Sequence, residues 1–179
     1  MEKHLFAGDL IIIINRLFDY MNKNKFDLSK YQTIWLVVLR VMIGWHFLYE
    51  GLVKVMNPNW SSFGYLMDSK GLFKGFFNGL ASNQDVLAIV DFANVWGLIA
   101  IGAGLILGMF TRIALWSGIL VLAMYYLSHP PFIGFNYALP MEGSYLLVNK
   151  ILIELVAMIV LLLFPTGKII GIDRLVCRK

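Results

Sequence analysis

The chain has 179 residues, of which 59% are hydrophobic and 15% are charged, and its formal net charge is +4. Soluble domains carry about one-quarter charged residues, so this composition excludes an ordinary soluble protein and indicates a single membrane domain. The basic residues gather towards the ends of the chain, where they indicate membrane topology rather than nucleic-acid binding. The single cysteine, Cys177, offers no internal disulfide and no cysteine cluster for a metal centre.

The first 32 residues are predicted to form a cytoplasmic or interfacial segment. Within them, the apolar run 10–17 is too short to cross a bilayer and has charged residues on both sides, so we expect an interfacial helix. The rest predicts an all-α membrane protein, with a bundle of four transmembrane helices in residues 33–165 and a cytoplasmic tail at 166–179. The four apolar segments of this bundle are 33–56, 92–110, 113–128 and 146–164.

The distribution of lysine and arginine predicts the orientation. Both ends of the chain are rich in these residues and the connection 129–145 has none, so both termini are expected on the cytoplasmic side of the membrane. The longest connection, 57–85, would then lie outside. Its aromatic residues are typical of segments at the membrane interface, and its length favours additional structure or function.

The first apolar segment carries four ionisable residues, Arg40, His46, Glu50 and Lys54. At about 100° per residue, they fall within an arc of about 120° on one helix face. A charged group that faces lipid at the centre of a membrane helix costs roughly 2.5 to 3.5 kcal/mol. This polar stripe is therefore expected to face protein or water.

Further polar residues come to the same side of the bundle when both termini are cytoplasmic. They lie at the outer ends of the second and fourth spans: Asp91, Asn94, Lys150 and Glu154. Together with the stripe they predict a nearly neutral network, which either fixes helix packing or lines a site for a polar or quinone-like group. Two histidines on the outer side, His46 and His129, leave axial haem ligation as a further alternative.

Three stretches of the chain resemble the DoxX and DoxD family of small bacterial and archaeal membrane proteins. They are LR-x3-G-x2-F-x2-EG-x2-K at 39–54 with NPNWSSFGYL at 57–66, LILGMFTRIALWSGILVLAMYYLSHPP at 105–131, and GKIIGIDRL at 167–175. For DoxD-like members, the resemblance implies the membrane subunit of a thiosulfate:quinone oxidoreductase. Such a subunit usually works with a second one, DoxA.

In this enzyme interpretation, the polar residues divide into two groups. Basic side chains would attract an anionic sulfur substrate or polarise a quinone carbonyl. The predicted substrate-binding residues are Arg40, Lys54, Asp91, Asn94 and Lys150. The predicted catalytic residues, which would relay the two protons that quinone reduction consumes, are His46, Glu50 and Glu154.

The alternative is a protein without catalytic activity that anchors a redox or stress-response complex, or binds lipid or quinone for it. No haem, flavin or metal motif is recognisable in the sequence, which favours this non-catalytic alternative; in the enzyme interpretation, quinone is the expected electron acceptor. Direct transfer from thiosulfate would need both substrates within the bundle, or a partner chain. The expected partners are therefore the lipid bilayer and a DoxA-like second subunit, and not nucleic acid.

Overall fold

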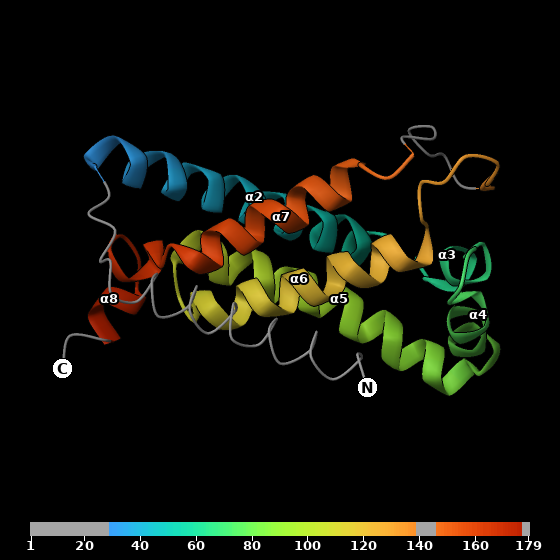
Figure 1. Ribbon diagram of the computed structural model, residues 1–179. Coiled ribbons are helices and arrows are strands. Elements are labelled where there is room, and N and C mark those ends of the chain that lie inside the picture. The colour runs from blue at the N-terminus through green and yellow to red at the C-terminus, as the bar shows by residue number, and fades with distance from the viewer. Residues whose placement is uncertain (1–28, 139–145, 177–179) are drawn as a thin grey trace, which may run out of the picture. The chain divides into compact units, whose positions relative to one another are not determined.

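The computed structural model describes residues 29–138 and 146–176, and every regular element within them is a helix (Figure 1). Residues from 35 onwards belong to one compact unit, and the packing and the site described below lie within it. The all-α prediction is confirmed for the described part of the chain. The predicted interfacial helix lies outside the described residues.

Within the described part of the chain, three helices are long and apolar enough to cross a membrane. They are α2 (Lys30–Met56), α5 (Gln84–Leu107) and α6 (Thr111–Ser128). A helix needs about 20 predominantly apolar residues to span the hydrocarbon core, and α2, α5 and α6 are close to this length or exceed it. The chain therefore has the helices of a multi-pass membrane protein.

The fourth predicted span contains a shorter helix, α7 (Lys150–Leu163). Its 14 residues extend about 21 Å at 1.5 Å per residue, less than the thickness of the hydrocarbon core. The side chain of Asn149 caps this helix by accepting a hydrogen bond from the amide of Leu152. This cap sets the start of α7 four residues after the start of the apolar segment.

The long connection 57–85 is folded. It contains α3 (Phe63–Met67) and α4 (Lys74–Ser82), and its last two residues already belong to α5. α5 begins about two turns before the predicted span because the side chain of Asn83 accepts hydrogen bonds from two amides of the first turn. The expected additional structure is therefore present in this connection.

Four helices, α2, α5, α6 and α7, share one hydrophobic core. Gly44 and Gly51 of α2 face α5, and Gly102 of α5 faces α2, so these two backbones approach closely. α5 packs on α6, and α6 packs on α7. In Figure 1, α3 and α4 lie together at one end of this bundle, the α3 end, and α8 lies at the other, the α8 end. The fully buried core side chains include Leu105, Leu115, Met158 and Leu161.

The C-terminal segment closes the α8 end of the bundle. It contains the short helices η1 (Thr166–Lys168) and α8 (Asp173–Val176). Two backbone hydrogen bonds, to the carbonyl groups of Leu107 and Gly108, join it to the turn between α5 and α6. The described part of the predicted tail is therefore bonded to the bundle.

Asp173 stabilises the start of α6. Its carboxylate accepts hydrogen bonds from the backbone amides of Phe110 (2.7 Å) and Thr111 (3.0 Å), as a helix N-cap does. Burial by itself raises the pKa of Asp173, but hydrogen bonds from Thr111 and Phe110 and the charge of Arg40 outweigh it and hold the pKa below its ordinary value. The cap therefore stays ionised at neutral pH.

Candidate functional site

A cavity of about 550 Å³ lies inside the half of the bundle that adjoins α3. Side chains from α2, α5, α6 and α7 line it, together with the segment that leads into α3. We refer to it as the polar cavity. It brings together six of the eight candidate residues: His46, Glu50, Lys54, Asn94, Lys150 and Glu154.

Lys54 lies at the centre of a hydrogen-bond network in this cavity. Its Nζ donates to Asn94 Oδ1 (2.9 Å) and to the hydroxyl of Tyr125 (3.5 Å), and Asn94 Nδ2 donates to the same hydroxyl (2.6 Å). The ammonium group also lies 4.9 Å from the ring centroid of Trp60, a cation–π contact. One charged group therefore joins α2, α5 and α6.

A second polar pair joins α2 to α7. Nδ1 of His46 lies 2.8 Å from a carboxylate oxygen of Glu154. The His46 side chain is 51% exposed and that of Glu154 is 13% exposed, so the histidine lies at the edge of the cavity and the carboxylate lies further inside. Glu50, one turn further along α2, lines the same cavity. These three side chains offer groups that accept and release protons.

Asp91, one of the predicted substrate-binding residues, does not line the polar cavity. Its carboxylate accepts hydrogen bonds from the backbone amide (2.9 Å) and the hydroxyl of Ser62. Ser62 precedes α3, and its neighbours Ser61, Gly64 and Tyr65 form part of the cavity wall. Asp91 therefore fixes this part of the cavity wall in place without lining the cavity.

Arg40, another predicted substrate-binding residue, also lies outside the polar cavity. Its side chain is 2% exposed, and the guanidinium donates to the hydroxyl of Thr166 (3.3 Å) and the carbonyl of Ile170 (2.8 Å) at the α8 end. Arg40 precedes Lys54 by 14 residues, about 21 Å along a helix. The two residues lie on the same helix face but at different positions along the helix axis. Arg40 therefore binds the C-terminal segment.

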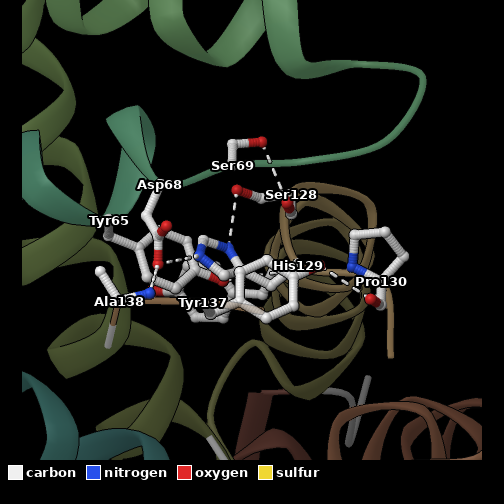
Figure 2. Close-up of polar contacts among 9 residues, drawn as sticks. Tyr65, Asp68, Ser69, Ser128, His129, Pro130, Tyr137 and Ala138 are labelled. Atoms are coloured by element: carbon white, nitrogen blue, oxygen red, sulfur yellow. Dashed lines mark hydrogen bonds and ion pairs between the residues drawn. The ribbon is translucent and has the colours of Figure 1, made fainter. Parts of the chain in front are cut away.

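A further polar cluster lies around His129, at the end of α6 (Figure 2). His129 is 1% exposed, with Nδ1 at 3.0 Å from the hydroxyl of Ser128 and Nε2 at 4.0 Å from a carboxylate oxygen of Asp68. Its ring stacks on Tyr65, with centroids 4.0 Å apart, and lies 4.7 Å from the ring of Tyr137. Tyr65 also lines the polar cavity, so this cluster supports one of its walls.

We expect the buried His129 to make the protein less stable in acid. Burial lowers its pKa from 6.5 to about 4, against the charge of Asp68, so within this range the unfolded chain binds a proton that the folded protein does not. The free energy of unfolding should therefore decrease as pH falls from about 6.5 to 4, by up to roughly 3 kcal/mol, and then level off.

Thermal unfolding of the wild-type protein and of His129→Phe across this pH range measures the effect. Phenylalanine keeps an aromatic ring between the two tyrosines but binds no proton, so this part of the pH dependence should disappear. Identical pH profiles for the two proteins would contradict the contribution of His129.

The two histidines of the haem alternative lie in different surroundings. His46 is paired with Glu154 at the edge of the polar cavity, whereas His129 is enclosed by Tyr65 and Tyr137. Among the residues that the structure describes, no group of three or more His, Cys, Asp or Glu side chains is arranged to hold a metal ion.

No family model, curated protein or solved structure matches the chain. The polar cavity is therefore the feature of the molecule that points to a function. It combines a fixed ammonium group, proton-carrying side chains and apolar walls that include Phe47, Leu98 and Leu122. Such a site suits a small molecule with polar oxygens on an apolar body. Trp60, Tyr65 and Tyr125 also line it, and the sequence offered no signal to separate them from other membrane aromatics.

Proposed function

We propose that the chain is the membrane subunit of a quinone-linked oxidoreductase of the DoxX and DoxD type, and that the polar cavity binds the quinone head group. In this proposal α7 is the fourth span, both termini are cytoplasmic, and the α3 end faces outwards from a bacterial inner membrane. The observation that carries the proposal is the composition of the cavity wall, where a fixed hydrogen-bond donor and proton carriers meet within a bundle of membrane helices.

Lys54 is the proposed partner of a quinone carbonyl. Asn94 and Tyr125 hold its ammonium group in place at 2.9 and 3.5 Å. Reduction of a quinone develops negative charge on its carbonyl oxygen, and a preorganised positive group stabilises that charge. Lys150 lines the same cavity and adds a second positive charge.

His46, Glu50 and Glu154 are the proposed proton carriers. Conversion of a quinone to a quinol takes up two electrons and two protons. Two thiosulfate ions that join through a new sulfur–sulfur bond, as tetrathionate, release two electrons, and a DoxA-like subunit would assist that step. The pair His46 and Glu154, 2.8 Å apart, is suited to hold a proton and pass it to a bound quinone.

The packing of α7 supports its assignment as the fourth span. Met158 and Leu161 of α7 are fully buried in the common core, and the helix lies along α6. A span shorter than the hydrocarbon core is accommodated when the bilayer becomes locally thinner, at a modest cost. A fourth span also returns the chain to the side on which the basic C-terminal residues are expected.

A non-catalytic role is the second candidate, and one observation favours it. The polar groups already satisfy one another between helices, through the pairs Lys54–Asn94 and His46–Glu154, as a network that holds helix packing does. In this role the chain would bind quinone or lipid, or anchor a redox complex, without transferring electrons.

Titration with a quinone tests the proposal. The full-length protein in lipid nanodiscs is titrated with decyl-benzoquinone, and quenching of tryptophan fluorescence, to which Trp60 in the cavity contributes, reports binding. Lys54→Met should weaken binding about tenfold to a hundredfold, because a hydrogen bond from a charged group contributes about 1.5 to 3 kcal/mol. Lys74→Met, on exposed α4 and outside the cavity, should leave the affinity unchanged.

Absence of saturable quenching, or equal affinities of the two variants, would contradict a quinone site at Lys54. The two candidate functions differ in turnover. Saturable binding without reduction of the quinone, when thiosulfate and the co-purifying subunits are present, would favour the non-catalytic role.

A further inference from the structure

The exposure of its lining residues shows where the polar cavity reaches the surface. The lining residues of α5 and α6 are buried or half-buried: Asn94, Leu98, Leu122 and Tyr125. The exposed ones belong mainly to the two helices on the other side, with His46 and Glu50 on α2 and Lys150 on α7. The cavity therefore has its floor on α5 and α6 and an opening between α2 and α7, which we call the lateral opening.

The α3 end of the cavity is covered more closely. The segment before α3 contributes Trp60, which is half-buried, and Ser62, which is buried and held by Asp91. Tyr65 lies against His129 and Tyr125. Only Ser61 and Gly64 of this wall are exposed. The larger share of exposed lining therefore belongs to the lateral opening.

The lateral opening lies at the depth of the membrane. α2 is one of the helices that are able to cross a bilayer, and His46 precedes its last residue, Met56, by ten residues, or about 15 Å. This distance is half the thickness of a hydrocarbon core of about 30 Å. On the same two helices, Tyr49 is 55% exposed and Ile153 is 61% exposed. The opening therefore faces lipid and has apolar side chains on the helices around it.

Charged side chains at such an opening need to be shielded from the hydrocarbon of the lipid. A carboxylate or imidazolium that faces hydrocarbon is costly, and ionisable groups in membrane proteins face protein, water or a ligand. A ligand with a polar head and an apolar tail meets both requirements, because the head satisfies Glu50 and the His46–Glu154 pair while the tail remains in lipid. A ligand without a tail would leave the opening uncovered.

We infer that the quinone of the proposed function enters the polar cavity between α2 and α7, with its tail leaving the cavity through this lateral opening. The inference rests on the proposed function and adds the path of the ligand. The contact between His46 and Glu154 joins α2 and α7 at the level of the bilayer centre, and it forms the edge of the lateral opening at that level. The tail therefore passes on the α3 side of this pair.

Photolabelling tests the path of the tail. The probe is a benzoquinone with a ten-carbon tail that carries a diazirine next to the ring, added to the full-length protein in nanodiscs. After irradiation, labelled peptides are identified by mass spectrometry, with and without an excess of unlabelled decyl-benzoquinone. The label that the unlabelled quinone suppresses is the competed label. We expect several-fold more competed label on the peptides of α2 and α7, around Tyr49 and Ile153, than on residues 57–82 or 130–138.

Two variants serve as matched controls. Lys54→Met should lose the competed label on α2 and α7 together with the affinity for the head group, whereas Lys74→Met should keep it. Competed label found mainly on residues 57–82 or 130–138 would overturn the lateral path and leave the quinone site standing. Label that unlabelled quinone does not reduce would overturn both the path and the proposed function.

Discussion

Gly102→Ala should destabilise the protein by about 2 to 3 kcal/mol, although alanine is favoured over glycine inside a helix. A β-carbon at position 102 would lie 2.6 Å from the carbonyl oxygen of Gly44 and 2.7 Å from the Cα of Leu48. These are backbone atoms, which cannot rotate away as a side chain does, so α2 and α5 would have to separate. Their separation would also move Lys54 away from Asn94 in the polar cavity.

Gly97→Ala is the matched control in the same helix. A β-carbon at position 97 would have no atom within 4 Å, and the substitution should leave the stability unchanged or raise it by up to about 1 kcal/mol. Unfolding in mixed micelles with increasing SDS, followed by circular dichroism, measures both variants. Equal stabilities of the two would mean that α2 and α5 do not approach as closely as described.

Arg40→Met should lower the free energy of unfolding by about 3 kcal/mol or more. Methionine keeps much of the apolar stem but removes the donor groups that bind Thr166 and Ile170. The carbonyl of Ile170 would lose its partner, and Asp173 would lose a nearby positive charge, each in a partly buried setting. The C-terminal segment should then separate from the bundle more readily.

Arg112→Met is the control for the loss of a positive charge at the same end. Arg112 is exposed, and its replacement should change the stability by no more than about 0.5 kcal/mol. The same SDS titration compares the two variants, and quinone binding is measured in parallel. If Arg40→Met abolished quinone binding at unchanged stability, Arg40 would act on the ligand and its structural role would be wrong.

The helices were predictable from the sequence, and their ends were less so. Apolar runs about 20 residues long indicate membrane helices because their length and hydropathy suffice for the inference. The ends depend on single capping side chains: Asn83 starts α5 about two turns before the uncharged run, and Asn149 shortens α7. Such caps lie outside the apolar pattern, so hydropathy does not detect them.

Part of the candidate site could also be predicted from the pattern of residues along one helix. His46, Glu50 and Lys54 follow one another at intervals of four residues, which places them on one face, and all three line the polar cavity. Arg40 shares that face but lies nearly two turns before His46 and about four turns before Lys54, against Thr166 and Ile170. A helical projection shows the angle of each residue around the helix axis but not its position along the axis. It is the position along the axis that separates Arg40 from the cavity.

The helical class, the membrane composition and the polar stripe of the first apolar segment follow from residue type and local spacing, so they can be predicted without a structure. The contacts of Lys54 with Asn94 and Tyr125, the contact of His46 with Glu154, and the cavity that these residues line could not be predicted in this way. Contacts between helices depend on the depth, the rotation and the close approach of each helix. These follow from the packing of several helices at once, including the glycine contact between α2 and α5, and not from the pattern of any one of them.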